Sequence, residues 1–284
     1  MVVTSMIRDI QLYYNQFTKT EKKIADYVME HSEEILFMSI TDLADACKVA
    51  DASVHRFCRT IGIKGYQEFK MKLSLSINME NSHTQETGKS IIENPTEATF
   101  EDTMKIGISV LEETRKLLKV DDVEKAVTMM EESKRIYFFG IGDSLLSARE
   151  ARNKFLRITN KVNCIDDPHM QAMVASMAGP EDLFIFISYS GSTKDNVYVT
   201  EIAQGVGAKI IAISRFLKSP LTNFTDVLLL CGVDEGPLEG GSIGAKFAQL
   251  YIIDVLFKEF YRRSGEIAKI NQEKTCRAVV EKLF

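Results

Sequence analysis

The stretch FIFISYSGSTKDN, residues 184–196, joins an apolar run to a cluster of hydroxyl side chains. Residues 183–187 are all apolar, which is typical of a strand buried on both faces of a parallel sheet. The polar residues that follow at once are Ser188, Ser190, Gly191, Ser192 and Thr193. Glycine lets a backbone approach a ligand closely, and hydroxyls donate to phosphate oxygens. The stretch therefore predicts a buried strand that ends in a ligand-binding loop.

The chain from residue 121 onward alternates between apolar strands and helices. We expect strands at 135–140, 162–166, 183–188, 210–214 and 227–231. We expect helices at 122–132, 144–158, 169–177, 193–205 and 242–263. This alternation predicts a doubly wound α/β domain with a five-stranded parallel sheet of the flavodoxin-like type.

A second predicted strand also ends in a polar loop. The sequence FFGIGDS, residues 138–144, contains Gly142 and Ser144 and runs directly into a helix. Ligands of open parallel sheets bind beyond the carboxyl ends of the strands, and helix starts attract anions. Ordinary turn and N-cap chemistry explains either loop alone. Two such loops in one sheet favour a pocket for a phosphorylated polyol.

A dinucleotide site is the main alternative for the first of these loops. Gly140-Ile141-Gly142 begins like a GxGxxG motif, and Asp166 stands where the acid for the ribose is expected. However, Leu145 replaces the third glycine, and the sequence contains no GxxxxGK[ST] motif. The five cysteines are far apart and form no CxxC pair. We therefore expect no cofactor and no metal.

The N-terminal residues 6–75 are expected to be all-helical. Thr18 and Ser39 each begin a capping-box pattern, and no proline occurs in this region. A third helix is expected at 51–61, where Gly62 ends it. Two short helices joined by about three residues match a helix-turn-helix motif.

Positive charge is concentrated in this region. The protein has a net charge of -5, but residues 48–72 contain six Lys or Arg against Asp51 and Glu68. A local basic excess in an acidic protein suggests an anionic partner, although a solvated helical face explains the charge as well. We expect double-stranded DNA to contact Lys48, Ser53, His55, Arg56, Arg59, Lys64 and Lys70.

The remaining segments connect and extend these two regions. Residues 76–100 are polar and read as a linker, and 101–119 as a connecting helix. The helix at 242–263 is apolar nearly all round, so we expect it to pack against the sheet and a partner subunit of a homodimer or larger oligomer. No apolar run approaches the roughly 20 residues that span a bilayer, and the N-terminus lacks a signal peptide, so we expect a cytoplasmic protein with no membrane partner.

Two known domain types resemble these patterns. The sequence GIGDSLLSAREARNKFLRI, with ISYSGSTKD and GAKIIAIS, resembles a SIS (sugar isomerase) domain over about 123–264. The sequences TKTEKKIADYV and SITDLADACKVADASVHRFCRTIGIKGYQEFK resemble the helix-turn-helix domain of RpiR-family bacterial regulators over 1–77. On this division, 78–122 form a linker and connecting helix, and 265–284 a C-terminal helix.

The resemblance implies a DNA-binding regulator of sugar or amino-sugar metabolism genes, controlled by a phosphosugar in the SIS domain. It implies that the phosphate is held by Ser144, Ser188, Ser190 and Thr193. The other residues that we expect near the ligand are Gly142, Gly191, Ser192, His169 and Glu239. The chain departs from the family pattern at four positions. Two are Ser53, where the family usually has threonine, and His55, where it usually has an apolar residue. Ala50 replaces the usual serine before the recognition helix, and Asp143 places a carboxylate next to the phosphate-binding Ser144.

An enzyme is the competing interpretation. A sugar-phosphate isomerase needs a positioned base, and only Glu239 and His169 are candidates, without a convincing pair. The helix-turn-helix motif has no role in such an enzyme. A SIS domain that no longer binds a ligand is a third, weaker interpretation. We therefore expect a regulator rather than an enzyme.

Overall fold

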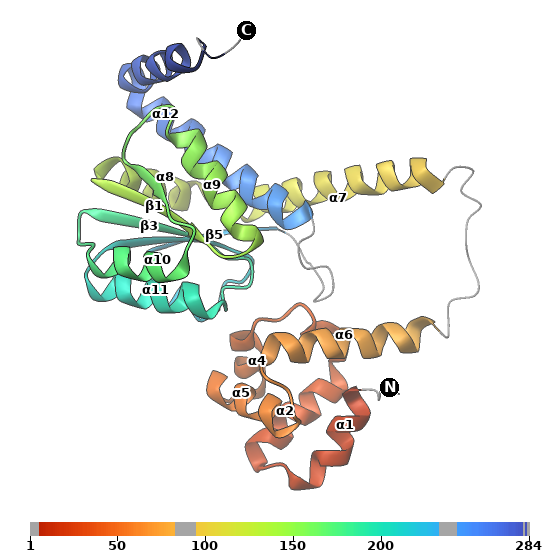
Figure 1. The fold of residues 1–284 in the computed structure, drawn as a ribbon. Coiled ribbons are helices and arrows are strands. Elements are labelled where there is room, and N and C mark those ends of the chain that lie inside the picture. Colours follow the sequence, from red (N-terminus) through yellow and green to blue (C-terminus); the bar gives the residue numbers. More distant parts are fainter. Residues whose placement is uncertain (1–5, 83–94, 233–242, 281, 283–284) are drawn as a thin grey trace. The chain divides into compact units, whose positions relative to one another are not determined.

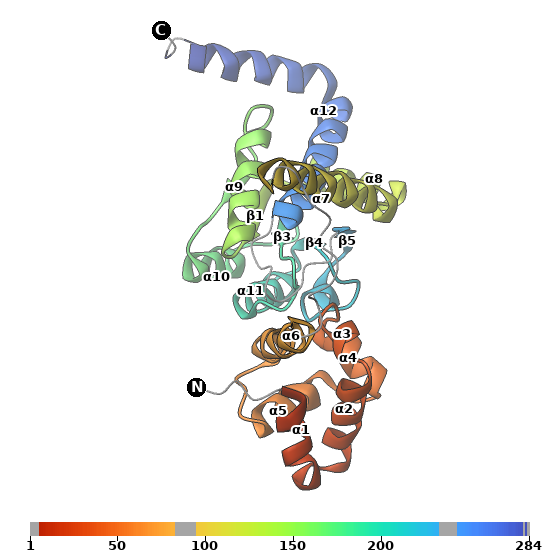
Figure 2. The ribbon, with the colours of Figure 1, turned by 90° about the vertical axis from the view of Figure 1, so that its right-hand side faces the viewer.

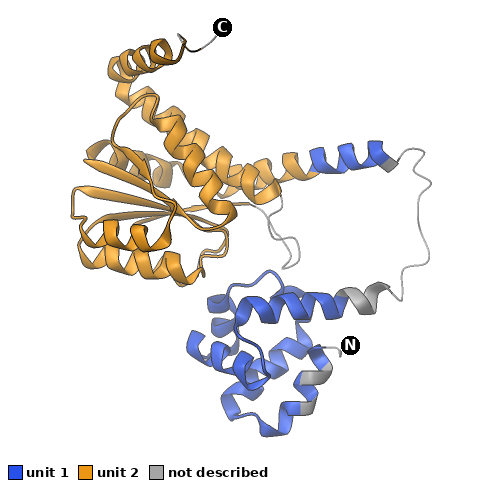
Figure 3. Cartoon of the chain, viewed as in Figure 1, with its two compact units in different colours: residues 1–105, 234–242 blue, residues 106–233, 243–284 orange. Residues whose placement is uncertain are grey.

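The computed structural model describes residues 6–82, 95–232, 243–280 and 282, which form two compact units (Figures 1 and 3). A helical unit holds the described residues up to 105, and an α/β unit holds those from 106 onward. The boundary falls within the long helix α7 (Pro95–Leu117). Each unit has a hydrophobic core of its own.

The helical unit packs short helices around a core that includes Leu43, Phe57 and Phe69, all fully buried. Its helices are α1 (Met6–Tyr13), the 3-10 helix η1 (Tyr14–Gln16), α2 (Lys19–Glu30), α3 (Ser32–Ile35), α4 (Ile40–Cys47), α5 (Asp51–Thr60) and α6 (Tyr66–Ser82). The predicted all-helical character of this region is confirmed.

Both predicted capping boxes are present. The Thr18 hydroxyl accepts from the Glu21 N–H at 3.3 Å, and the Glu21 carboxylate accepts from the Thr18 N–H at 2.9 Å. Ser39 and Asp42 make the same pair of bonds, each at 3.0 Å. Each box satisfies backbone N–H groups that have no partner within the helix, and so fixes where α2 and α4 begin.

The predicted helix-turn-helix corresponds to α4 and α5. Ala50 is the N-cap residue of α5 and offers no side-chain cap. The carboxylate of the next residue, Asp51, accepts from the Thr41 hydroxyl at 2.9 Å, which ties α5 to α4. At the other end Gly62 has a φ of 77°, and the Ile63 N–H donates to the Cys58 carbonyl at 2.8 Å. This left-handed cap ends α5 where the sequence predicts.

The predicted linker at 76–100 is wrong at both ends. Helix α6 continues to Ser82, and α7 begins at Pro95, whose fixed φ suits the first turn of a helix. Ser76 is buried in α6, and its Oγ accepts from the Met6 N–H at 2.9 Å. This tertiary contact supports the helix where the local sequence has no clear periodicity. Residues 83–94 lie outside the described residues.

The α/β unit alternates strands and helices as predicted. The strands are β1 (Arg135–Gly140), β2 (Val162–Cys164), β3 (Asp182–Ile187), β4 (Lys209–Ser214) and β5 (Val227–Leu230). The helices are α8 (Val120–Glu132), α9 (Asp143–Phe155), α10 (Pro168–Ser176), α11 (Lys194–Gly205), the 3-10 helix η2 (Leu221–Phe224) and α12 (Ile243–Val280).

The five strands form one parallel sheet in the order β2-β1-β3-β4-β5. Side chains alternate along β1, so that Phe138 joins the core under α8, α9 and α12, and Phe139 joins the core under α10 and α11. Figures 1 and 2 show these helices on opposite faces of the sheet. The prediction of a doubly wound, five-stranded parallel sheet is confirmed.

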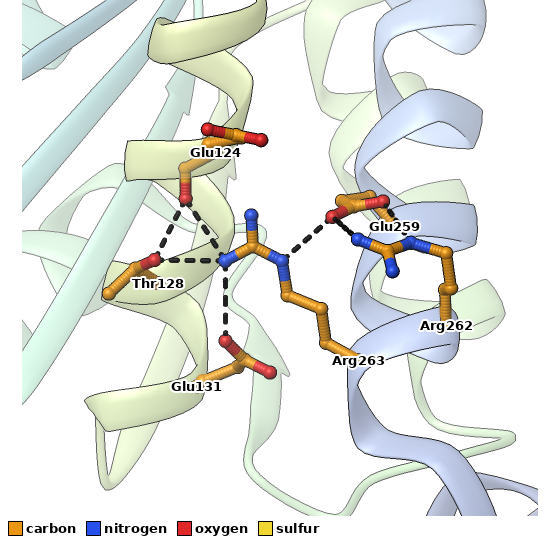
Figure 4. Close-up of polar contacts among 6 residues, drawn as sticks. All are labelled: Glu124, Thr128, Glu131, Glu259, Arg262 and Arg263. Carbon is orange, nitrogen blue, oxygen red and sulfur yellow. Dashed lines mark hydrogen bonds and ion pairs between the residues drawn. The ribbon is translucent and has the colours of Figure 1, made fainter.

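Helix α12 is kinked at Gly265, whose φ of 54° and ψ of -125° are not helical. The predicted helix at 242–263 and the predicted C-terminal helix thus meet at this kink. Before it, Arg263 donates to the Thr128 hydroxyl at 2.9 Å and to Glu259 at 2.7 Å, which joins α12 to α8 (Figure 4). Among the described residues, no helix is long and apolar enough to cross a membrane.

Candidate functional site

The two polar loops begin side by side at one edge of the sheet. Gly140, the last residue of β1, pairs in register with Ile187, the last residue of β3. The strand order also reverses here, because the chain passes from β1 to β2 on one side and then to β3 on the other. Open parallel sheets bind their ligands at such a switch point. The loops after Gly140 and Ile187 therefore define the candidate ligand site.

The loop after β1 turns tightly into α9. Gly142, the N-cap residue, has a φ of 59°, which favours glycine. A Cβ on Gly140 would lie only 2.7 Å from the Ser144 carbonyl oxygen, so glycine is required at this close approach. The two glycines hold the first turn of α9, with its unpaired backbone N–H groups, against the end of β1.

Ser144 lies in that first turn and is half-buried. Its Oγ accepts from Gln249 Nε2 of α12 at 3.4 Å. The carboxylate of the neighbouring Asp143 forms an ion pair with Lys246, also of α12, at 3.4 Å. The start of α12 therefore contacts two consecutive residues of this loop.

The loop after β3 is held by hydrogen bonds of its own. Ser188 is buried, and its N–H donates to the Ile213 carbonyl at 3.0 Å. The Ser192 N–H donates to Ser190 Oγ at 3.2 Å, and Ser192 Oγ donates to the Ser190 carbonyl at 3.1 Å. A loop fixed in this way loses little conformational entropy when a ligand binds.

Gly191 and Thr193 differ in whether a structural role alone explains the residue type. Gly191 has a φ of 59°, and a Cβ there would lie 2.1 Å from Ser219 Oγ, so packing alone requires a glycine. Thr193 is the N-cap residue of α11, but its side chain makes no capping hydrogen bond in the described structure. N-cap chemistry therefore does not account for the Thr193 hydroxyl.

Besides Gln249, sequence reasoning misses two more buried amides near these loops. Gln171 of α10 donates from Nε2 to the Ile165 carbonyl at 2.7 Å and the Gly140 carbonyl at 3.4 Å, which ties β1 to the end of β2. Asn196 of α11, one turn beyond Thr193, is 1% exposed. Its Oδ1 has no hydrogen-bond partner among the described residues. An amide within an otherwise apolar helical face was the only signal available in the sequence.

The two predicted acid–base candidates are not brought together. His169 is exposed in the first turn of α10, and no hydrogen bond or ion pair described for the chain joins it to either loop. Glu239 lies outside the described residues. Nothing in the described structure therefore assembles a base for isomerisation.

Asp166, the residue that a dinucleotide site would use to bind the ribose, already has a partner. Asp166 accepts from Arg149 through both carboxylate oxygens, at 3.0 and 2.5 Å. These hydrogen bonds from Arg149 hold the pKa of Asp166 below its usual value. A carboxylate already engaged in this way is a poor partner for ribose hydroxyls.

Cavities also occur elsewhere in the α/β unit. One of about 450 Å³ lies between α9 and the end of α12, and its lining is mainly apolar, including Leu156 and Val279. Another of about 450 Å³ lies between α8 and α12 and includes Val123 and Tyr251. The second lining also includes Arg115, Lys119, Lys258 and Arg262. A third cavity of about 470 Å³ has a mainly polar lining that includes Lys154, Arg157 and Gln272. The choice of the two polar loops therefore rests on their place at the switch point of the sheet.

The recognition helix α5 presents most of the predicted DNA-contacting residues to solvent. Arg56 and Arg59 are exposed, as is Lys64 just beyond the helix, and His55 is half-buried. Ser53 is only 7% exposed, and its Oγ accepts from Arg56 Nη2 at 3.1 Å. Ser53 is therefore placed to orient Arg56 rather than to contact a base itself.

Lys48 occupies the turn between α4 and α5. It is exposed, and it is the only non-glycine residue with positive φ, 54°, among the described residues. A left-handed conformation costs a residue with a Cβ roughly 1–2 kcal/mol. The turn therefore holds a lysine at this position at some cost in stability.

Lys70 does not fit the predicted interface. It is 5% exposed, and its Nζ donates to the carbonyl oxygens of Leu36 at 3.1 Å and Met38 at 3.0 Å. An ammonium group enclosed in this way cannot reach a DNA phosphate. The predicted role of Lys70 in binding DNA is wrong for this reason.

Comparison with known families gives two matches along the chain. Residues 4–80 match the helix-turn-helix domain of the rpiR family, and residues 129–259 match the SIS domain. Together the two matches cover most of the chain.

Known transcription regulators, one of them with a solved structure, are similar to this chain over nearly its whole length. An uncharacterized HTH-type transcriptional regulator of Haemophilus influenzae is 31% identical over 279 residues, covering 98% of this chain and 97% of the relative. The regulator HexR of Pseudomonas aeruginosa is 31% identical over 270 residues, covering 92% and 90%. The structure of Vibrio vulnificus NanR complexed with ManNAc-6P has a TM-score of 0.87 and 26% identity, covering 98% and 99%.

Proposed function

The chain belongs to the RpiR family of helix-turn-helix transcription regulators that carry a SIS domain, and on this basis we propose that a phosphosugar bound at the β1 and β3 loops controls its binding to DNA. The register between Gly140 and Ile187 is the observation that carries the proposal. It brings two helix starts and their serine and threonine hydroxyls to the switch point of the sheet.

The phosphate is assigned to Ser188, Ser190 and Thr193, with Ser144 on the opposite wall. Hydroxyls and helix-start N–H groups both stabilise an anion. Because NanR is similar over nearly the whole chain and its structure contains ManNAc-6P, a 2-acetamido sugar phosphate is the first ligand to test. We place Gly142, Gly191 and Ser192 in the loop backbone around the phosphate, and His169 and Glu239 near the sugar.

The DNA interface is assigned to Lys48, His55, Arg56, Arg59 and Lys64, with Ser53 supporting Arg56. We propose that the DNA-binding domain ends with α6 and that the SIS domain begins near residue 123. We further propose that the regulator acts as at least a dimer, because Ile243 and Leu250 of α12 are large apolar residues left exposed, at 46% and 38%. Light scattering that gives a monomer at micromolar concentration would contradict this.

Ligand binding is tested by calorimetry of the full-length protein with N-acetylmannosamine 6-phosphate, other hexose 6-phosphates and the unphosphorylated sugars. We expect one phosphosugar to bind, its unphosphorylated sugar not to bind, and the phosphosugar to be recovered unchanged after incubation. Turnover to an isomer would establish the competing enzyme function. Binding of no phosphosugar would leave a SIS domain without a ligand and refute the proposal.

The DNA-binding half is tested with Arg56→Ala on duplexes selected from a random-sequence library by the wild-type protein. Loss of one base contact costs about 1–3 kcal/mol, so we expect affinity to fall at least about fivefold. Arg277→Ala, which removes an exposed arginine of α12, is the matched control and should bind normally. Equal dissociation constants for Arg56→Ala and the control would remove Arg56 from the interface.

A further inference from the structure

The first turns of α12 contact the candidate phosphate site through two side chains. Lys246 and Gln249 are three residues apart and therefore lie on the same face of the helix. Lys246 Nζ is 3.4 Å from Asp143 Oδ1, and Gln249 Nε2 is 3.4 Å from Ser144 Oγ. One face of α12 thus contacts two consecutive residues at the start of α9.

Asp143 poses an electrostatic problem for the proposed ligand. Its carboxylate is adjacent in sequence to Ser144, and a like charge at short range disfavours a phosphate dianion. The Lys246 ammonium compensates this charge. The Lys246 side chain is 32% exposed and that of Asp143 is 55% exposed, so solvent screens this ion pair in part.

Gln249 fixes the Ser144 hydroxyl. It is 2% exposed, and Ser147 Oγ donates to its Oε1 at 2.6 Å, which holds the amide in one orientation. The Nε2 group then donates to Ser144 Oγ. Because a hydroxyl has one proton and two acceptor lone pairs, Ser144 keeps its proton to donate to a ligand oxygen.

We infer that the start of α12 completes the phosphate site, with Lys246 neutralising Asp143 and Gln249 orienting the hydroxyl of Ser144. The inference rests on the proposed function, since it concerns the same site. Lys246 and Gln249 are positioning residues, because each acts through a residue of the β1 loop.

The test is a double-mutant cycle with N-acetylmannosamine 6-phosphate and inorganic phosphate as probes, measured by calorimetry. Lys246→Met leaves Asp143 uncompensated, and we expect the dissociation constant to rise at least about tenfold, or about 1.4 kcal/mol. In an Asp143→Asn background, the same Lys246→Met substitution is expected to change affinity by less than about threefold. This rescue separates charge compensation from a structural role, which Asp143→Asn would not restore.

Two variants control for charge and folding. Lys246→Arg keeps the charge and should bind like the wild type. Lys258→Met makes the same substitution further along α12, where Lys258 pairs with Asp254 at 2.7 Å, and should also bind like the wild type. Circular dichroism of all variants confirms that they are folded.

The possible outcomes distinguish this inference from the function on which it rests. If the wild type binds a probe and Lys246→Met binds it equally well, the inference fails and the proposed function stands. A loss that persists undiminished in the Asp143→Asn background also overturns it. If the wild type binds neither probe nor any other phosphosugar, the proposed function fails and the inference with it.

Gln249 is tested in the same way against its own partner. Gln249→Leu removes the donor at similar volume, and we expect affinity to fall about threefold to tenfold, as for one lost hydrogen bond. In a Ser144→Ala background the substitution should have no further effect. An equal loss in both backgrounds would show that Gln249 acts only through packing.

Discussion

Lys70 hydrogen-bonds through Nζ to two backbone carbonyls, those of Leu36 and Met38, from within α6. These bonds join α6 to the segment that leads into α4, so the side chain supports the arrangement of the helix-turn-helix. Burial lowers the pKa of the Lys70 ammonium to about 8 from 10.5. The N–H donors of Lys70 stabilise the fold through these two hydrogen bonds, whereas burial of its positive charge destabilises the fold at neutral pH.

This cost predicts a specific dependence of stability on pH. Between about pH 8 and 10.5 the unfolded chain binds a proton at Lys70 that the folded chain has released, so stability rises with pH. Relative to Lys70→Met, which has no such proton, the wild type should gain on the order of 3 kcal/mol across this range. The measurement is urea unfolding of the helical unit at several pH values.

Lys19→Met, which removes an exposed lysine of α2, provides the control and should show no such trend relative to the wild type. If the difference between the wild type and Lys70→Met stays constant from pH 7.5 to 10.5, Lys70 titrates normally and the predicted burial cost is absent.

For single residues, the sequence predicts which chemical groups are present but not which residues they contact. Lys70 and Arg56 both lie in the basic segment, and nothing local separates the buried residue from the exposed one. The carbonyls that bind Lys70 are 32 and 34 residues away in sequence. Gln249 is 105 residues from Ser144. Contacts of this kind depend on how whole elements pack, so neither the error at Lys70 nor the omission of Gln249 was avoidable from sequence patterns.

At the scale of elements, Arg263 provides one polar link from α12 to α8, where it also pairs with the Glu131 carboxylate at 3.6 Å. Glu259 accepts from Arg262 at 2.6 Å and from Arg263 at 2.7 Å, and Arg263 also donates to Thr128 of α8 (Figure 4). The hydrogen bonds from Arg262 and Arg263 lower the pKa of Glu259 to about 2. The carboxylate therefore remains charged, and keeps Arg263 in place, well into the acid range.

A lowered carboxyl pKa contributes stability that is present above the unfolded value of 4.5 and is lost as pH falls towards about 2. Glu259→Gln removes this contribution, so at pH 7 the variant should be less stable by on the order of 1 kcal/mol, as for a solvent-screened ion pair. As pH falls from 4.5 the two proteins should converge. Thermal unfolding across this range checks the prediction, and a gap that widens with acid would contradict it.

The elements of the α/β unit were predictable because β1, β3, β4 and β5 each contain a continuous apolar run between polar loops. Predicted and observed strand ends differ by at most two residues, as in β2, which ends at Cys164 rather than Asp166. The boundaries of α6 and α7 were not predictable, because the end of α6 depends on contacts such as that of Ser76 with Met6. The closeness of the two glycine loops was predictable because parallel strands bring their carboxyl ends to one edge.

At the scale of the whole molecule, the two proposed binding sites belong to different units of one chain. The exposed basic residues of α5 lie in the helical unit, and the hydroxyl loops lie in the α/β unit. A regulator needs a coupling free energy between such sites, typically about 1–3 kcal/mol. Because α12 contacts the phosphate site directly through Lys246 and Gln249, it is the element through which we expect that coupling to begin.

Coupling of this kind predicts a reciprocal effect between phosphosugar and operator DNA. In Ser190→Ala this effect should persist but require a higher phosphosugar concentration. If the phosphosugar changes operator affinity by some factor, operator DNA must change phosphosugar affinity by the same factor. Removing the Ser190 hydroxyl costs one hydrogen bond to a charged group, about 1.5–3 kcal/mol, and also the bond that it accepts from the Ser192 N–H. The phosphosugar should therefore bind roughly tenfold or more weakly. Operator affinity without ligand should be unchanged, because Ser190 and the basic helix lie in different units.

The measurement is operator binding by fluorescence anisotropy at increasing phosphosugar concentration, for the wild type, Ser190→Ala and the control Ser176→Ala. Ser176 is an exposed serine of α10 whose hydroxyl bonds only to the Met173 carbonyl among the described contacts. The response of Ser190→Ala should move to higher concentration by the same factor as its dissociation constant in calorimetry, and reach the same plateau. A changed plateau, or a midpoint that does not follow the dissociation constant, would mean that the β3 loop transmits the signal rather than only holding the phosphate.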